Sequence, residues 1–141
     1  MTDSKMTCSE MNQLFATHFK VREKPWPEIT EVKKDYVKIE LETGPTQMRP
    51  GGFINGPTQM ALADQVAYAV IFTRLGAVTM AMTSNLNIDF LRPCKGEKLI
   101  AEGEMIKLGR SLALISVTLR GSDNERLSSR ATVTYVLPKE A

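Results

Sequence analysis

The sequence predicts an α+β fold in which one antiparallel sheet of five to six strands wraps around a long central helix. Three observations lead to this prediction. Residues 57–75 form a helix pattern that is apolar on nearly every side, the later segments alternate apolar and polar residues, and short turns separate them. A helix of this kind must be covered on most sides, and strands joined by short turns run antiparallel. A single sheet curled around the helix satisfies both requirements.

Composition and charge narrow the class of protein. The chain has 141 residues, 43% of them hydrophobic, which is enough for the core of one domain. We interpret residues 1–34 as a helix and loop segment of the same domain and residues 35–141 as its main body. The net charge of +2 comes from dispersed lysines and arginines, so no nucleic-acid partner is expected.

Two further observations favour a soluble cytoplasmic protein that does not interact with membranes. The first residues contain no apolar run of the signal-peptide type. The apolar segment Met60–Leu75 carries charges and is shorter than the ~20 residues that cross a bilayer. Cys8 and Cys94 are too few for a disulfide framework, so reduced thiols are expected.

The N-terminal third predicts one helix and one strand. Ser9 is a candidate cap for an opening helix whose apolar residues recur at helical spacing: Met11, Leu14, Phe15 and Phe19. Prolines within residues 24–27 end any helix there. Apolar and charged residues then alternate over 35–42, which predicts a half-buried strand. A loop rich in glycine and proline follows over 43–56.

The central helix has clear start and stop signals. Pro57 suits the first helical turn, where its missing N–H costs nothing. Asn55 or Gly56 can precede it as the cap, and Gly76 suits the C-terminal stop.

The remainder of the chain predicts four strands, over residues 78–90, 99–108, 113–119 and 127–137. Gly103 is interpreted as a bulge inside the second of them. Turns at 109–110 and 122–124 make the four strands an antiparallel meander. The sheet edges are open to pairing with a second chain, so a homodimer with a continuous sheet is expected.

Asp64 is the leading candidate for chemistry. Its helical neighbours at three and four residues, which include Met60 and Tyr68, carry no positive charge, so no local ion pair compensates it. A carboxylate buried without a partner is costly. An exposed or capping role is the common one for an isolated aspartate, but the apolar surroundings favour a functional role here.

The start of the helix is the second candidate. Asn55, Gly56 and Pro57 lead into a helix N-terminus, whose free N–H groups and partial positive charge favour a polarised carbonyl oxygen. Asp64 lies about 12 Å further along the same helix. Both groups can act on one substrate atom only if two helices lie side by side, so the predicted site is shared across a dimer.

Other kinds of site are excluded by the absence of their motifs. The sequence contains no Gly-x-Ser-x-Gly elbow, no phosphate-binding loop and no dinucleotide fingerprint. The single histidine, His18, lies on the apolar side of the first predicted helix, where packing is its usual role. One histidine and two distant cysteines exclude the usual zinc sites. No metal and no cofactor are expected.

Four motifs in order resemble one known family. Residues 55–64 read NGPTQMALAD and resemble the His-Gly-Gly-x-x-x-x-Leu-Ala-Asp signature of hotdog-fold acyl-CoA thioesterases of the phenylacetic-acid-degradation type. Residues 87–93 (NIDFLRP), 103–110 (GEMIKLGR) and 131–135 (ATVTY) also match. The resemblance covers roughly residues 35–138 and makes residues 35–141 a hotdog thioesterase domain. The fold of that family, a long helix wrapped by an antiparallel sheet, agrees with the arrangement expected from the hydrophobic pattern.

The resemblance implies roles for particular residues. Asp64 takes the position of the catalytic carboxylate, as general base or nucleophile. Gly56 takes the position whose backbone N–H polarises the thioester carbonyl from the partner chain. Thr83 falls near the residue that places the attacking water. The family assembles as dimers and dimers of dimers, in which coenzyme A, as part of the substrate, lies in the dimer groove.

Further residues are assigned to substrate binding. Cations at strand ends and turns are expected to meet the phosphates of coenzyme A: Arg92, Lys95 and Arg110. The walls of the acyl pocket are expected to include Phe53, Met60, Tyr68 and Met82, with methionines packing adaptably.

The sequence departs from the family at two signature positions. Asn55 replaces the histidine, and Pro57 replaces the second glycine. Asparagine forms hydrogen bonds but does not titrate near neutral pH, and Pro57 leaves the N–H of Gly56 intact. A thiolate leaves readily without protonation, so one carboxylate and one N–H suffice for hydrolysis.

Three functions are therefore open at this point. The leading hypothesis is hydrolysis of an aryl or medium-chain acyl-CoA to free acid and coenzyme A. The alternatives are a non-catalytic hotdog protein that binds acyl-CoA or an aromatic acid, and hydration of an enoyl thioester, which usually needs a histidine near the aspartate.

Overall fold

The computed structural model describes residues 3–18 and 27–139. It contains two helices, α1 (Cys8–His18) and α2 (Gly56–Leu75), and six long strands. The strands are β1 (Pro27–Lys33), β2 (Tyr36–Glu42), β5 (Met82–Phe90), β6 (Lys98–Leu108), β7 (Leu112–Gly121) and β8 (Ser129–Val136). A short 3-10 helix, η1 (Pro45–Gln47), and a small hairpin, β3 (Met48–Arg49) with β4 (Phe53–Ile54), lie between β2 and α2.

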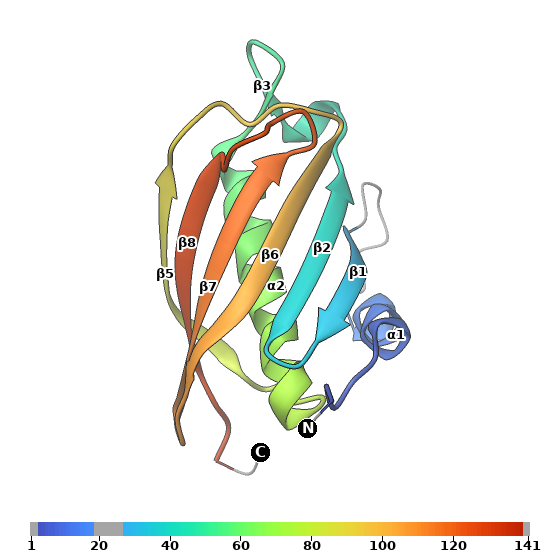
Figure 1. Ribbon diagram of the computed structural model, residues 1–141, viewed down its shortest axis with the longest axis vertical. Helices are drawn as coiled ribbons and strands as arrows, with labels where there is room; N and C mark the ends of the chain where they lie inside the picture. The colour runs from blue at the N-terminus through green and yellow to red at the C-terminus, as the bar shows by residue number, and fades with distance from the viewer. Residues whose placement is uncertain (1–2, 19–26, 140–141) are drawn as a thin grey trace.

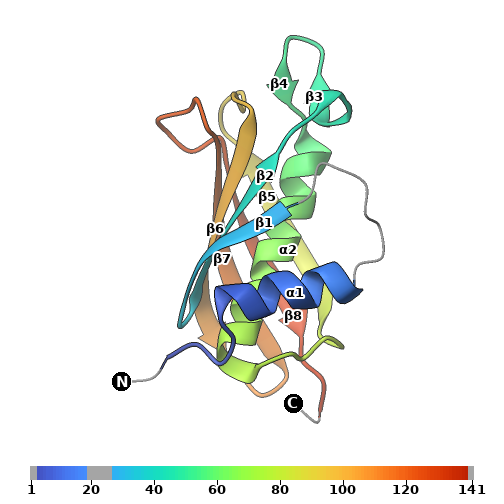
Figure 2. The same ribbon diagram turned by 90° about the vertical axis from the view of Figure 1, so that its right-hand side faces the viewer.

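The six long strands form one antiparallel sheet in the order β1-β2-β6-β7-β8-β5. Figures 1 and 2 show α2 running along the inner face of the curled sheet, with α1 beside β1. The α+β class, the long central helix and the antiparallel sheet are confirmed.

The core lies between α2 and the inner face of the sheet. Every second residue of β7 points inward and is fully buried, from Ala113 to Leu119. Gly103 lies on β6 tightly against α2, because a side-chain carbon there would meet Val70 Cγ2 at 2.9 Å and Val66 Cγ1 at 3.4 Å. The predicted bulge at Gly103 is therefore wrong, since pairing is unbroken at this residue and shifts between Met105 and Lys107 instead.

The central helix starts and ends where the sequence predicts. Asn55 is the N-cap, a proline occupies the first turn, and Gly76 ends the helix with φ of 77°. The opening helix differs in its cap. Thr7 Oγ1 accepts a hydrogen bond from Glu10 N (3.1 Å), and Glu10 Oε1 accepts one from Thr7 N (2.9 Å), so the cap is a box on Thr7 rather than Ser9.

Two predicted features of the sheet are wrong. The strand that was expected from residue 78 begins at Met82, because Val78 and Ala81 donate turn hydrogen bonds instead. The last four strands are not a simple meander, because β5 pairs with β8 and β6 pairs with β2. Residues 91–97 cross the end of the sheet from β5 to β6. The two strands are three inter-strand spacings apart, about 14 Å, and a loop of this length can extend to about 23 Å.

The alternation of apolar and polar residues did not predict strand β1. Its core residue Ile29 and half-buried Val32 stand three apart rather than two, because the pairing with β2 shifts between Ile29 and Glu31. Phe19 and the proline-containing stretch 24–26 lie outside the described residues, as does the side chain of His18.

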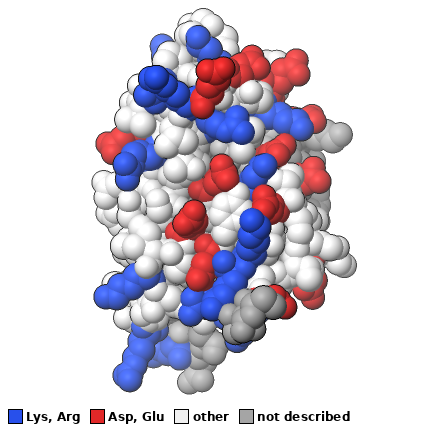
Figure 3. Space-filling view, in the orientation of Figure 1, with Lys and Arg blue, Asp and Glu red and all other residues white. Residues whose placement is uncertain are grey.

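The described chain has no helix that could span a membrane, and the outer face of its sheet carries charges of both signs. No described helix combines the length and hydropathy that crossing a bilayer requires. Positive and negative side chains are interspersed over most of the outer face of the sheet (Figure 3).

Candidate active site

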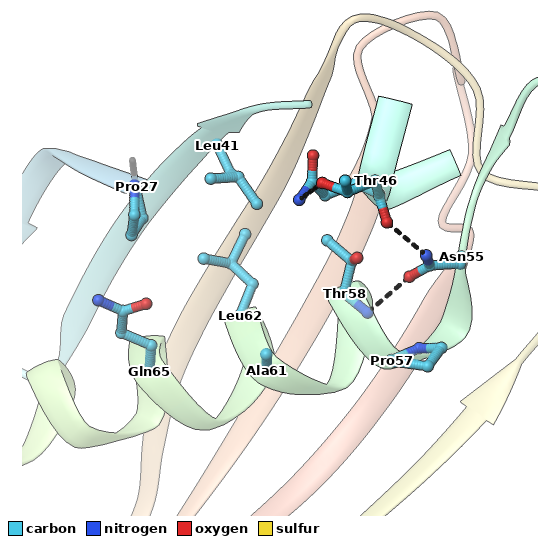
Figure 4. A pocket seen from close by; sticks show the side chains of 10 residues that line it. Pro27, Leu41, Thr46, Asn55, Pro57, Thr58, Ala61, Leu62 and Gln65 are labelled. Atoms are coloured by element: carbon cyan, nitrogen blue, oxygen red, sulfur yellow. Dashed lines mark hydrogen bonds between the residues drawn. The ribbon is translucent and has the colours of Figure 1, made fainter. Parts of the chain in front are cut away.

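The first turn of α2 is held in place by Asn55. Its side-chain oxygen accepts a hydrogen bond from Thr58 N at 2.9 Å, and its amide donates to Thr46 O at 3.4 Å. Its backbone N–H donates to Gln47 O at 2.8 Å. Asn55 therefore ties the helix start to η1, as Figure 4 shows. Both ends of its amide are engaged in this capping, and its assignment as a catalytic residue stays a prediction.

Gln59 fixes the same turn from the other side. Its side chain is 4% exposed, donates to Ile54 O at 3.2 Å and accepts a hydrogen bond from Ser129 Oγ at 2.7 Å. This pair links α2 to β8. The sequence pattern gave no signal for Gln59, because a lone glutamine on an apolar helix is as easily placed at its surface.

Gly56 is the first residue of α2, so its N–H has no partner within the helix. The Phe90 ring lies beside it, with Cζ 3.3 Å from where a side-chain carbon of residue 56 would stand. A cavity of about 330 Å³ opens here, lined by Gly56, Phe90, Phe53, Arg49 and Arg92 among others. Gly56, at the positive end of a helix, thus lines a cavity that two arginines border, and such a place suits an anionic or polarised oxygen.

Asp64 lies two turns further along α2 and receives two hydrogen bonds on one oxygen. Thr83 Oγ1 donates to Asp64 Oδ1 at 2.7 Å, and the Tyr135 hydroxyl donates to the same Oδ1 at 2.8 Å. Within the described part of the chain, no hydrogen bond to Oδ2 and no ion pair to Asp64 is found. The structure thus brings together Asp64 and Thr83, two of the residues assigned to the site, and their roles stay predictions.

Asp64 is half-buried rather than buried. The sheet covers most of α2 but leaves one stripe of the helix open between its two edge strands, β1 and β5, and the exposed residues Pro57, Met60 and Ala61 lie on this stripe. The expectation of full burial is wrong for a single chain because the sheet ends at β5.

A bulge in β5 turns Thr83 toward Asp64. Leu86 and Thr83 stand three residues apart, so in a regular strand they would face opposite sides. The pairing with β8 shifts between Thr83 and Asn85, so Ser84 is the extra residue and both Thr83 and Leu86 face α2.

Tyr135 is a site residue that the sequence analysis did not single out. It lies on β8 directly opposite Thr83, is 4% exposed, and its hydroxyl also lies 3.1 Å from the main-chain oxygen of Asp64. Burial raises the pKa of Tyr135 above its ordinary value, with the Asp64 charge as a smaller cause. A signal was present, because period two places Tyr135 on the inner face, where a buried hydroxyl requires a partner.

The residues predicted to bind substrate fall into separate groups. Phe53 and Arg92 line the cavity beside Gly56, and Lys95 Nζ lies 5.8 Å from the centre of the Phe53 ring. Arg92 donates to Leu127 O at 2.7 Å.

Met60, Met82 and Tyr68 lie nearer Asp64 on α2 and β5. Met60 and Met82 are exposed, at 41% and 67%. Tyr68 stacks on Tyr135 with ring centres 5.7 Å apart, and its hydroxyl donates to Thr79 O at 2.7 Å. Arg110 lies in the turn between β6 and β7, at the opposite end of the sheet from the start of α2 (Figure 1). Within one chain it is not brought together with Arg92 and Lys95.

A second cavity of about 390 Å³ lies on the other side of the helix start. Figure 4 shows its walls, with Leu41 and Leu62 facing one another and Thr46, Thr58 and Gln65 around them. None of the described residues that line it is charged. Among the described residues, no cluster of three or more histidine, cysteine, aspartate or glutamate side chains suits a metal ion.

The chain is similar in sequence and in fold to known proteins. A family model described as the thioesterase superfamily matches residues 51–128. A candidate esterase of Thermoplasma acidophilum is 26% identical over 110 residues, which is 78% of this chain and 82% of that protein. The crystal structure of a candidate thioesterase from Silicibacter sp. TM1040 superposes with a TM-score of 0.86 and 28% identity, covering 96% of this chain and 94% of that one.

A Streptococcus mutans protein whose crystal structure contains acetyl-CoA shares the fold. Its TM-score is 0.70 at 21% identity, covering 84% of this chain and 94% of that one.

Proposed function

The chain belongs to the thioesterase superfamily, and on that premise we propose that it hydrolyses acyl-CoA thioesters to a free acid and coenzyme A. The observation that carries the proposal is Asp64, a carboxylate on the open stripe of α2 with one oxygen held by two hydroxyl groups. Its placement fits a group that activates water. The acyl group is proposed to be aryl or medium-chain, as the resemblance to the phenylacetic-acid-degradation thioesterases suggests.

In the proposed reaction, Asp64 acts as general base. It takes a proton from a water molecule whose oxygen attacks the thioester carbonyl carbon. The carbon–sulfur bond breaks in the resulting tetrahedral intermediate, and the electron pair leaves with the coenzyme A sulfur. A thiolate with a pKa near 8.5 needs little protonation to leave, so no second titrating group is required.

The backbone N–H of Gly56 is proposed to stabilise the oxygen that becomes negatively charged. One such donor is worth about 2.7–4 kcal/mol in the transition state. Because Asp64 and Gly56 of one chain lie about 12 Å apart along α2, the Gly56 that serves a given Asp64 is proposed to come from a partner chain. The open stripe of α2 and the unpaired edge β5, on which Met82 and Phe90 are more than half exposed, provide a surface for that partner.

Coenzyme A is proposed to enter beside Gly56. Arg49 and Arg92 border the cavity there, and guanidinium groups suit phosphates. The acetyl-CoA in the Streptococcus mutans relative supports a coenzyme A ligand for this fold. The assembly is proposed to be a homodimer or a dimer of dimers.

The test is release of free thiol from a panel of acyl-CoAs by wild type, Asp64→Asn and Glu104→Gln. Glu104 is exposed on β6, an interior strand of the sheet, and serves as the control. We expect wild type and Glu104→Gln to release thiol alike and Asp64→Asn to lose nearly all activity. Equal rates for wild type and Asp64→Asn would remove Asp64 from the mechanism.

A second function is favoured by one observation. Asn55 replaces the signature histidine, and its amide is engaged in capping α2. Without that histidine the protein could bind acyl-CoA or an aromatic acid and release it unchanged. Tight equilibrium binding of acyl-CoA, with no thiol released from any thioester of the panel, would identify a binding protein.

A further inference from the structure

We propose that Tyr135 is a positioning residue that, together with Thr83, holds one oxygen of Asp64 and so assigns the other oxygen, Oδ2, to proton abstraction. This inference rests on the proposed hydrolysis. It adds a residue to the site and states which atom of the carboxylate reacts.

Two hydroxyl groups from neighbouring strands converge on a single oxygen. Thr83 on β5 and Tyr135 on β8 are directly paired in the sheet, and their hydroxyls lie 2.7 and 2.8 Å from Asp64 Oδ1. The bulge at Ser84 is needed for this, because it turns Thr83 inward. The arrangement therefore depends on both the pairing of the strands and its irregularity.

The consequence for Asp64 follows from how a carboxylate rotates. Its terminal torsion is broad, and half a turn exchanges its two oxygens. Two donors on Oδ1 fix the plane of the carboxylate, and charge-assisted hydrogen bonds of this kind are among the stronger ones. Oδ2 then keeps its lone pairs for water in a single orientation, and general-base catalysis depends on that geometry.

Tyr135 is itself rigidly placed. Its ring stacks on Tyr68 at 5.7 Å with 22° between the planes, and its strand is paired on both sides, with Ala113 of β7 and Thr83 of β5. Its hydroxyl is also 3.1 Å from the main-chain oxygen of Asp64. A rigid ring that contacts both the side chain and the backbone of one residue fixes the position of that residue on α2. A tyrosine hydroxyl is protonated and able to donate across the neutral range, and burial raises the pKa of Tyr135 further above that range.

The test compares Tyr135→Phe with Tyr36→Phe. Both changes remove only a hydroxyl that donates to a carboxylate, but Tyr36 bonds Glu102 on β6, away from the site. Phenylalanine keeps the ring and its stacking, and thermal unfolding shows whether each variant is folded. Steady-state thiol release then gives kcat and KM separately.

We expect Tyr135→Phe to lower kcat by about tenfold to a hundredfold with KM within about twofold of wild type. Tyr36→Phe should match wild type. Thr83→Val should lower kcat as Tyr135→Phe does, and Thr83→Ser should retain more activity than Thr83→Val because it keeps the hydroxyl. In an Asp64→Asn background, Tyr135→Phe should cause no further loss, since the group it positions is gone.

The outcomes separate this inference from the proposed function. Full kcat in a folded Tyr135→Phe, or an effect on KM alone, would overturn the positioning role while hydrolysis by Asp64 stands. If Asp64→Asn were as active as wild type, or wild type released no thiol, the proposed function would fail and this inference with it.

Discussion

Replacing Gly56 by proline removes the proposed oxyanion donor while leaving every other group of the site in place. Proline is tolerated at the first position of a helix, where the N–H has no partner within the helix. The preceding residue must then be extended, and Asn55 already has φ of −74° and ψ of 161°. The substitution is therefore compatible with the backbone before it.

Gly56→Ala is the matched control, because it adds the same side-chain carbon but keeps the N–H. In both variants that carbon lies 3.3 Å from Phe90 Cζ, and the ring can yield because Phe90 is 51% exposed. Both also place a side chain before Pro57, which disfavours helical geometry to a similar extent. The difference between the two variants isolates the N–H.

Loss of one oxyanion donor costs about 10²–10³ in kcat, or about 2.7–4 kcal/mol. We therefore expect Gly56→Pro to be about 10²–10³-fold slower than Gly56→Ala in thiol release from the best acyl-CoA of the panel. Thermal unfolding should give both variants similar stability. If the two folded variants turned over at rates within about threefold of each other, the N–H of Gly56 would have no part in stabilising the transition state.

Two further predictions concern the fold. Gly103→Ala should lower the free energy of unfolding by about 1–3 kcal/mol, because its side-chain carbon would meet Val70 Cγ2 at 2.9 Å. Gly44→Ala is the control, because the nearest atom to its side-chain carbon is Gln47 Oε1 at 3.4 Å, and it should change the free energy of unfolding by less than about 0.5 kcal/mol. Urea titration measures both variants, and equal losses of stability would refute the close packing of β6 on α2. Burial raises the pKa of Tyr36, Tyr68 and Tyr135 in the folded protein. The unfolded chain, whose tyrosines have a pKa of about 10, therefore ionises first as the pH rises. The contribution of these tyrosines to the free energy of unfolding is complete below that pKa and is lost as the pH rises above it. Urea unfolding at increasing pH should show this loss, with a shallower slope for Tyr135→Phe, and an identical slope would contradict burial of that hydroxyl.

The sequence predicts most of the fold because local signals and the global arrangement agree. Asn55, Pro57 and Gly76 define α2 at both ends, and strict alternation defines β2, β7 and β8. The predictions fail where a bulge or a crossover interrupts the regular order of the strands. Strand β1 is obscured by its bulge, and the place of β5 beside β8 depends on a crossover that no local pattern encodes.

The residues of the site also divide into those that the local sequence predicts and those that depend on how the strands pair. Asp64 stands out because a carboxylate is unusual on so apolar a helix, and Gly56 stands out because of its place at the helix start. Tyr135 escapes notice because an inward tyrosine on a strand resembles any other core aromatic residue. Only the pairing of Thr83 with Tyr135, and the bulge beside it, show that both hydroxyls meet one oxygen of Asp64. Such convergence depends on register, which sequence patterns specify poorly.

The central claim is that each site combines Asp64 of one chain with Gly56 of another, and mixed dimers test it most directly. Asp64→Asn and Gly56→Pro are each expected to be nearly inactive alone. When they are co-expressed in equal amounts, half of the dimers contain one of each, and one of the two sites in such a dimer has both native groups. We predict recovery of about a quarter of wild-type thiol release. No recovery above the sum of the two separate variants, in a preparation shown to contain mixed dimers, would contradict a site shared between chains.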